Sequence, residues 1–542
     1  MSEKDKAAIV AKKDDFILPN IGDLQLFESK TGVGLFPDRI IFKSELLGTE
    51  NFQNIIDAVI EDIADEIDEA NADESEKISL FLKKYLRIDW DEFDVEEDKN
   101  PILTISQYLD SLELNPQFVT EINKNPLTQF LLEINRNEFL KRNYNQKDTN
   151  GQIRFESLSE IATRELQSKP YYKRILNSTI WDEPKNGEDD KGDTKFIEAL
   201  SQRKDDFKNY HKYICVVKAD GDKIGKTLEK ITGSKIFDFS KKLLDWGLLA
   251  KDRIREYGGV PIYVGGDDLL FFAPISNGKE NIIDLIDAID ELFADRNWLE
   301  INEEITPSLS YGISLTYYKF PLGEAIEEAN ELLYTAKGGD KNLEKAIKLL
   351  SEDKYRFNEV KQILELPKYK GIEAITEIIE LLDDVQFNEN ERKSKAKEQI
   401  DIYNKKNSSN AIVLKLLKHS GTEFELVLKK SDPLYQTHFK SIINKMVDDQ
   451  SFLNSVGYKL RDNHELIKII GQEPTHLANL FHNVFDEKLE NKQETDLYME
   501  QVRLLVNYSY IQQNHDIDKT MKEVFSIIRT SKFIKGLEEV KN

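Results

Sequence analysis

Residues 213–225 read YICVVKADGDKIG, and residues 260–272 read VPIYVGGDDLLFF. Both stretches contain an apolar, β-prone run beside aspartate and glycine, so each predicts a strand with acidic residues at its end. Gly265 and Gly266 stand between two such runs and predict a two-residue hairpin loop, because the primed turns of hairpins need positive φ. We therefore expect Asp220 to end the first strand and Asp267 to begin the strand after the hairpin.

The neighbouring segments complete a known order of elements. Apolar residues at helical spacing predict helices near 236–257 and 279–294, and a predicted strand at 308–318 precedes a helix at 322–337. This βαββαβ order is the ferredoxin-like arrangement. We expect its sheet to have one face covered by helices and one open face.

Two further regions flank the segment 206–350. Residues 1–205 combine short apolar runs with helical patterns, whereas residues 351–542 show helical periodicity throughout, including residues 411–417. The predicted fold class is therefore α+β. We expect a ferredoxin-like domain over residues 206–350, between a mixed N-terminal region and an all-helical C-terminal domain.

Composition limits the class of protein. A chain of 542 residues is too long for one core and predicts several domains. No apolar run reaches the roughly 18–20 residues of a membrane span, and no apolar stretch follows the charged N-terminus, so we expect a cytoplasmic protein. Cys215 is the one cysteine, which excludes an intramolecular disulfide.

The net charge of −25 is unevenly distributed. Residues 1–100 hold 26 acidic and 12 basic side chains, a net of −14, which leaves −11 for the remainder. Such acidic runs are typical of solvated helix faces and loops. The total therefore neither supports nor excludes binding of RNA.

The acidic residues predict a metal site for phosphoryl chemistry. The first and third strands of a ferredoxin-like sheet are central neighbours, so Asp220 and Asp267 should converge. Close carboxylates repel each other unless a cation neutralises them, and Mg²⁺ or Mn²⁺ favours oxygen ligands. Two ions would activate an attacking hydroxyl and stabilise leaving pyrophosphate. Asp268 should point to the opposite face from Asp267 and is expected as a second ligand or a supporting group.

Candidate nucleotide-binding residues surround these carboxylates. They are the residues of the predicted turns and of one helix end: Gly221, Asp222, Lys223, Gly225, Gly265, Gly266, Lys337 and Lys341. Free amides of the turn after Asp220 can cradle phosphate oxygens with Lys223 as a point charge, although an ordinary strand-to-helix turn is the alternative. Lys337 and Lys341 would contact a triphosphate or simply complement a helix dipole.

These motifs carry a resemblance to a known family. Residues 219–225 and 265–268, and the segment from Tyr311 to Lys337, resemble the second palm domain of the large subunit of type III CRISPR effector complexes, with the best fit to the Cmr branch. Residues 155–163 resemble the segment that leads into that palm. The N-terminal stretch 35–41 is similar to the start of the family.

The resemblance implies an enzyme and its partners. It implies a nucleotidyltransferase, activated by target RNA, that makes 3′–5′ linked cyclic oligoadenylate from ATP. It also implies a degenerate palm within residues 1–205 and a helical C-terminal domain that contacts small subunits. The implied partners are backbone, small and guide-end-binding subunits together with guide RNA and target RNA, and no membrane.

Two features depart from the family pattern. Many relatives carry an N-terminal HD nuclease domain, but all seven histidines here lie at or after His211. The frequent cysteine zinc site is also missing. We therefore expect this chain to signal rather than to cut DNA.

Three other functions stay open at this stage. A diguanylate cyclase has a similar palm, but Leu269 stands where an aromatic residue is expected and Asp340 replaces a glycine. The same palm could join AMP to another acceptor, such as S-adenosylmethionine. A scaffold without catalysis would be favoured by loss of the acidic residues, all of which are present.

Overall fold

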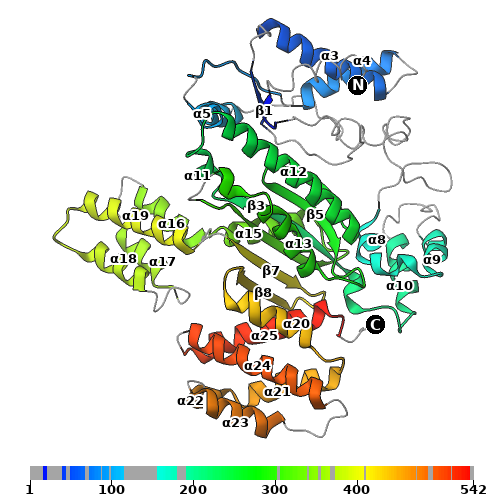
Figure 1. The fold of residues 1–542 in the computed structure, drawn as a ribbon, viewed down its shortest axis with the longest axis vertical. Coiled ribbons are helices and arrows are strands. Elements are labelled where there is room, and N and C mark those ends of the chain that lie inside the picture. The colour runs from blue at the N-terminus through cyan, green and yellow to red at the C-terminus, as the bar shows by residue number, and fades with distance from the viewer. Residues whose placement is uncertain are drawn as a thin grey trace.

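The computed structural model describes most of the chain. The described ranges are 16–20, 39–43, 49–67, 72–86, 88–96, 99–114, 156–179, 191–301, 305–338, 341–351, 356–366, 373–407, 410–470, 473–485, 492–513 and 515–537. Figure 1 shows a central sheet with helical regions on several sides of it.

The central sheet contains the predicted ferredoxin-like core. Its four strands are β3 (Tyr213–Asp222), β4 (Val260–Gly265), β5 (Asp268–Pro274) and β6 (Ser308–Tyr317), in the order β4-β5-β3-β6 with antiparallel neighbours. Helices α12 (Ser234–Tyr257) and α13 (Ile282–Ala294) pack on one face, where they share a large apolar core with the strands. The predicted fold class is confirmed, and β3 lies at the centre with β5 beside it.

Two strands from the C-terminal region extend this sheet. β7 (Ala411–Leu417) pairs with β6 in parallel, and β8 (Glu423–Lys429) pairs with β7 in antiparallel, so the sheet has six strands. The prediction of a helix at 411–417, and of an all-helical region after 351, was therefore wrong. Every residue of β7 except Lys415 and Leu417 is buried, as expected of a strand inside a sheet.

The second face of the sheet is not open, in contrast to the prediction. Helices α15 (Leu322–Ala336) and α8 (Leu158–Ala162) pack against it over Ile214, Val216 and Phe272. Gly312 of β6 makes this close approach possible. A methyl group at Gly312 would lie 2.1 Å from the carbonyl oxygen of Ala329, so α15 needs a residue without a side chain there.

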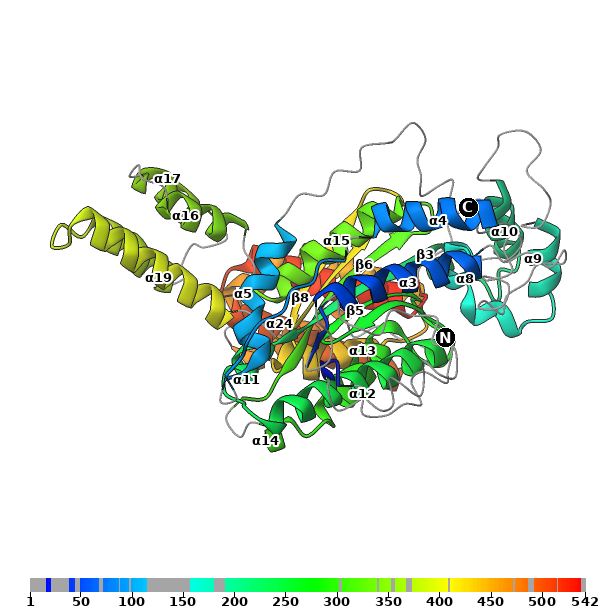
Figure 2. The ribbon, with the colours of Figure 1, turned by 90° about the horizontal axis from the view of Figure 1, so that it is seen from above.

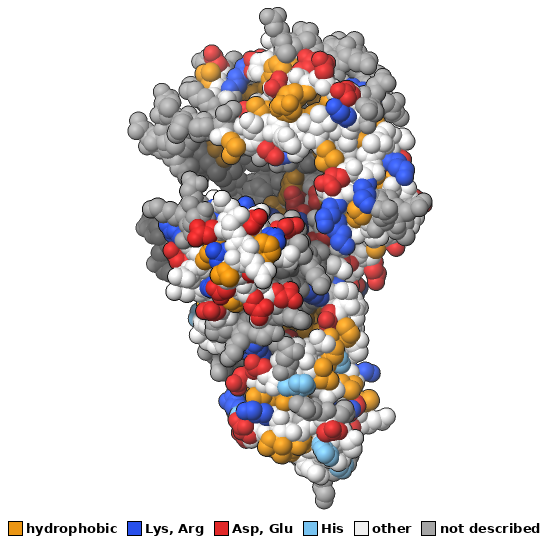
Figure 3. Space-filling view, turned by 90° about the vertical axis from the view of Figure 1, so that its left-hand side faces the viewer, with side chains coloured by type: hydrophobic (Ala, Val, Ile, Leu, Met, Phe, Trp, Pro, Cys, Tyr) orange, Lys and Arg blue, Asp and Glu red, His pale blue; other side chains and the backbone are white. Residues whose placement is uncertain are grey.

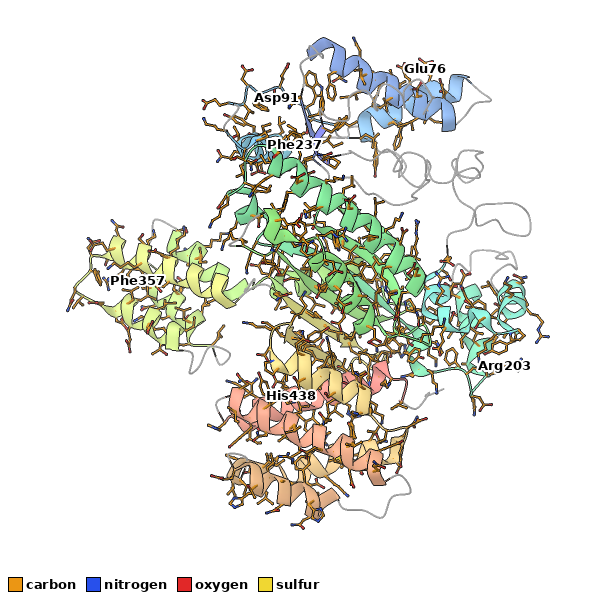
Figure 4. The ribbon with its side chains drawn as sticks, viewed as in Figure 1. Glu76, Asp91, Arg203, Phe237, Phe357 and His438 are labelled. Carbon is orange, nitrogen blue, oxygen red and sulfur yellow. The ribbon has the colours of Figure 1, made fainter. Side chains whose placement is uncertain are left out.

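Four helices between α15 and β7 form a separate unit, here called the four-helix module. They are α16 (Lys341–Ser351), α17 (Phe357–Leu364), α18 (Glu373–Asp383) and α19 (Glu389–Asn407). They pack mainly on one another around a core of their own. Phe357 lies in this module, with the Arg392 guanidinium 5.2 Å from its ring (Figure 4). The module projects away from the sheet in Figures 1 and 2.

The remaining helices flank the sheet at both ends of the chain. After β8, a π-helical turn η5 (Leu434–Phe439) leads into six helices that pack below the sheet: α20 (Lys440–Lys445), α21 (Gln450–Asp462), α22 (His464–Ile470), α23 (Pro474–Phe485), α24 (Lys492–Gln512) and α25 (Ile517–Ile534).

The described N-terminal residues are mostly helical. They form a small sheet of β1 (Phe16–Leu18) and β2 (Ile41–Phe42) and the helices α3 (Thr49–Ile67), α4 (Ala72–Tyr85), α5 (Pro101–Glu113), α9 (Tyr172–Thr179) and α10 (Lys191–Ser201), with two short 3₁₀ turns, η2 (Arg164–Ser168) and η3 (Asn209–Lys212). A second palm sheet is not seen among the described residues before 206, so the degenerate palm stays a prediction.

Within the described ranges, none of the helices combines the length and the apolar character that crossing a membrane requires. Figure 3 views the face from which the four-helix module projects. Acidic, basic and apolar side chains are interspersed over that face, and the surface is hollowed beneath the uppermost part of the molecule.

Candidate active site

The end of β3 carries its carboxylates on the face that α15 covers. Side chains alternate along a strand, so Asp220 shares a face with Ile214 and Val216, which pack against α15. Lys337 follows the last residue of α15 and donates from Nζ to the Asp220 carboxylate and, at 3.0 Å, to the carbonyl of Gly221. The predicted Lys337 thus lies at the strand end, where its charge offsets that of Asp220.

The hairpin turn lies one residue later than predicted. Gly265 pairs with Asp268, so the two loop residues are Gly266 and Asp267, and β5 begins at Asp268. Gly266 has a φ of 65° and Asp267 does not have a positive φ. Positive φ at the first loop residue alone is the pattern of a type II′ turn. Asp267 therefore lies in the turn rather than at the start of a strand.

The side chain of Asp267 rests against the backbone of β3. A methyl group at Gly221 would lie 2.7 Å from both Cβ and Oδ2 of Asp267, so only glycine leaves room for this carboxylate. The structure thus brings Asp267 beside the residue that follows Asp220. Burial raises the pKa of Asp267 to about 7, and the charges of Asp220 and Asp268 add to that rise.

Asp268 occupies a different environment. Its side chain is exposed, and the β3–β5 register, continued by one pair beyond Ala219 and Leu269, sets Asp268 opposite Asp220. Residues opposite each other in an antiparallel pair lie on the same face. Asp268 therefore belongs to the face of Asp220, next to Asp267 at the tip.

Asp222 lies in the strand and not in the predicted turn. β3 continues through Gly221 to Asp222, which pairs with Ser308 at the start of β6. The carboxylate is 3% exposed and accepts hydrogen bonds from Ser308, Ser310 and the backbone N–H of Asn410. With these partners the side chain of Asp222 joins three segments of the protein.

The turn after β3 is correspondingly shorter than predicted. It consists of Lys223, which has a φ of 64°, and leads at once into the short helix α11 (Ile224–Leu228). Lys223 is exposed, and a methyl group at Gly225 would meet no atom within 4 Å. Both residues border open space beside the tip, and their contact with phosphate stays a prediction.

The other candidate residues lie at the tip or next to it in sequence. Gly265 ends β4 and Gly266 opens the turn that holds Asp267. Lys341 begins α16, and its side chain lies outside the described part of the structure. A role for Lys341 in binding a triphosphate therefore stays a prediction.

The carboxylates fit a divalent cation that is shared with a substrate. Across the described ranges, no group of three or more His, Cys, Asp or Glu side chains forms a ready metal site. Mg²⁺, however, is usually held by one or two carboxylates together with substrate phosphates and water. Asp220 and Asp267 are the residues that would hold such an ion, because their crowded negative charges favour it.

Sequence reasoning missed four residues that support the tip. Ser308, Ser310 and Asn410 bind Asp222, and the buried Asn100 donates from its amide to the carbonyls of Leu228 at 2.7 Å and Ile231 at 3.1 Å. The alternation of small residues at 308, 310, 312 and 314 is a signal for two of them, since such residues share one strand face. Asn100 and Asn410 come from distant segments and leave no local signal.

A βαββαβ sheet with acidic residues at the tips of its two central strands defines a palm domain. Residues 213–344 match the family described as Cas10/Cmr2, second palm domain. The match spans about a quarter of the chain and supports a Cas10-type large subunit, from a family with nucleotidyltransferase-like palms that belongs to type III CRISPR complexes. No curated protein matches the chain.

Proposed function

We propose that the chain is the nucleotidyltransferase subunit of a type III CRISPR antiviral complex of the Cmr branch, and that it makes cyclic oligoadenylate from ATP. The observation that supports this proposal most is the place of Asp267, against Gly221 and beside Asp220, within the matched palm. The pKa of this carboxylate is raised to about 7, and strongly shifted carboxylates cluster at catalytic sites, which favours an enzyme over a scaffold.

The proposed reaction joins two nucleotides. The 3′-hydroxyl of one adenylate attacks the α-phosphorus of an ATP, a new P–O bond forms, and pyrophosphate leaves. A bound divalent cation would lower the pKa of the attacking hydroxyl and offset charge on the phosphates. Asp220 and Asp267 would hold that cation. The positively charged Lys337 ammonium, which binds Asp220, would then bind a phosphate oxygen instead.

Target RNA is proposed to gate this reaction. The four-helix module begins just after Lys337, which binds Asp220, and ends just before Asn410, whose N–H binds Asp222. A rotation of the module would therefore act on two carboxylates of one strand face. Since a shift of about 1 Å in reacting groups changes a rate roughly a hundredfold, a small movement is sufficient as a switch.

The test uses the assembled complex with guide RNA and labelled ATP. We expect oligoadenylate and pyrophosphate when complementary target RNA is added, and a decline after that RNA is cut and released. Parallel reactions contain S-adenosylmethionine, and a labelled conjugate with it would identify a different acceptor. Equal rates with and without target RNA would make a free-standing nucleotide cyclase the better interpretation.

We also propose that the subunit lacks an HD nuclease and signals from the cytoplasm. Residues 1–210 hold no histidine, and an HD site needs imidazole ligands. The proposed partners are backbone, small and guide-end-binding subunits, guide RNA and target RNA. Single-stranded DNA should stay intact when it is incubated with the complex and Mn²⁺. Cleavage that persists in Asp220→Ala and maps to residues 1–210 would contradict this proposal.

A further inference from the structure

Asp222 is a buried carboxylate that accepts hydrogen bonds from three donors, two serine hydroxyls and one backbone N–H. Ser308 Oγ lies 2.8 Å from Oδ2, Ser310 Oγ lies 2.9 Å from both oxygens, and the N–H of Asn410 lies 2.7 Å from Oδ2. Burial of a charge is unfavourable unless such hydrogen bonds satisfy it. The arrangement therefore fixes the position of Asp222 closely.

Asp222 shares a strand face with Asp220. The two residues are two positions apart in β3, so their side chains point the same way. Their partners on β6 are Ser308 and Ser310, and Ser310 both pairs with Asp220 in the register and binds Asp222 through its hydroxyl. A displacement of Asp222 relative to β6 must therefore move the β3 backbone that carries Asp220.

The third donor connects this strand to the last two strands of the sheet. Asn410 precedes β7 and has a φ of 57°, and its carbonyl accepts from the N–H of Lys430 at 2.9 Å. Asn410 is thus held between Asp222 and the end of β8. The end of β3 is fastened to β6 on one side and to the start of β7 on the other.

We propose that Asp222 is a positioning residue. It holds the end of β3 in place, so that the Asp220 carboxylate lies where the cation and the substrate need it. It acts through its hydrogen bonds, without contact to metal or nucleotide. The proposal rests on the proposed function for its rate measurement. Its metal-binding measurement is independent of that function.

The test compares Asp222→Ala, which removes all the bonds, with Asp222→Asn, which keeps an acceptor oxygen in the same place. The readouts are kcat and KM for ATP in the guide-loaded complex with target RNA, Mn²⁺ affinity of the free subunit by electron paramagnetic resonance, and the melting temperature. We expect Asp222→Ala to lower kcat roughly a hundredfold with little change in KM and to weaken Mn²⁺ binding. Asp222→Asn should retain most of the wild-type kcat and most of the wild-type Mn²⁺ affinity.

Ser310→Ala is a second test variant, and Ser314→Ala is its matched control. Both serines are buried in β6 on the same face, and each donates to a carboxylate, Asp222 for Ser310 and Glu328 for Ser314. Ser310→Ala should lower kcat, whereas Ser314→Ala should leave kcat unchanged at a similar loss of melting temperature. Equal effects of the two on kcat would overturn the proposal.

The remaining outcomes also distinguish the positioning role of Asp222 from its alternatives. Equal loss of Mn²⁺ affinity in Asp222→Ala and Asp222→Asn would make Asp222 a metal ligand and overturn the positioning role. A lower melting temperature with unchanged kcat and Mn²⁺ affinity would leave Asp222 a structural residue only. Without nucleotide product from the wild-type complex the proposed function fails, and the Mn²⁺ measurement still tests the positioning role. A wild-type subunit that binds no Mn²⁺ overturns it.

Discussion

Two groups of clustered carboxylates in this protein differ in how far their negative charge is balanced by neighbouring side chains. The first, at the contact between α13 and the C-terminal region, contains Asp287 and Asp290. Asp290 accepts from the Tyr311 hydroxyl at 2.9 Å and from Lys430 at 2.5 Å. Asp287 accepts from Tyr435 at 2.7 Å and lies 2.8 Å from the ammonium of Lys440.

The second group is the strand tip, where the carboxylates of Asp220 and Asp267 share one lysine, Lys337. Lys337 binds Asp220 directly, and burial leaves Asp267 with a pKa raised to about 7. Burial also raises the pKa of Asp290, and Lys430 and Tyr311 offset part of that rise. The matched group joins two regions of the protein, whereas we expect the unmatched group to retain an affinity for positive charge.

The largest expected effect breaks the unmatched group. Asp267→Ala or Asp220→Ala should reduce nucleotide polymerisation about a thousandfold or more, because each would remove a proposed ligand of the cation that stabilises the transition state. Labelled ATP and the assembled complex provide the measurement. Asp252→Ala, at an exposed position of α12, is the control and should retain full activity. Full activity in Asp267→Ala would remove the basis of the site.

The next effect breaks the matched group. Asp290→Ala should lower the free energy of unfolding by about 3 kcal/mol, because it leaves the ammonium of Lys430 buried without its carboxylate. Lys430 is 7% exposed. Urea denaturation of the free subunit measures the change. Asp267→Asn in the absence of metal should cause no loss, and a comparable loss in both variants would refute the contrast between the two groups.

A pH series sharpens the comparison further. The pKa of Asp267 is about 7 in the folded protein against an ordinary value of 3.8, so between these values the folded state holds a proton that the unfolded state has released. The contribution of Asp267 to stability therefore falls as pH rises through this window. Without metal, wild type should lose stability relative to Asp267→Asn as pH rises from 5 to 7. A constant difference would contradict the raised pKa.

The same proton competes with the cation. Mn²⁺ affinity should fall by up to about tenfold per pH unit below pH 7, since the ion binds the deprotonated carboxylate. Electron paramagnetic resonance between pH 5.5 and pH 8 measures this slope. Asp267→Asn should bind weakly with a flatter profile, and an equally steep profile in that variant would assign the proton to another group.

The smallest effect concerns Asp268. This side chain is exposed at the start of β5, so we expect Asp268→Ala to reduce polymerisation by no more than about tenfold. The measurement is the rate with labelled ATP, beside Asp267→Ala in the same preparation. A loss as large as that of Asp267→Ala would make Asp268 a full ligand and would extend the unmatched group to three carboxylates.

The sequence was sufficient for the order of the palm elements because each strand and helix there has a clear period and a clear end. It was insufficient where a short apolar run has two interpretations. Residues 411–417 fit a helix or a buried strand equally well, and only the free edge of β6 decides between them. A partner about a hundred residues away in sequence is not visible in a local pattern.

The site errors have a similar cause. Gly221 looks like the end of a strand, but β6 supplies pairing partners beyond it, and β3 therefore continues to Asp222. The hairpin glycines predict a turn, yet the register of β4 and β5 sets its position one residue later. Local residues thus indicate that a turn exists, and the neighbouring strand determines where it begins.

The parallel pairing of β6 with β7 has a consequence for synthesis and for protein engineering. β6 is finished at residue 317, but the strand that protects its edge follows only at 411. During synthesis on the ribosome, one edge of β6 stays unpaired until about a hundred further residues have been made. An exposed strand edge is a known route to aggregation. A fragment cut at 344, where the family match stops, would keep that edge permanently exposed. A soluble palm fragment should extend through residue 429, the end of β8.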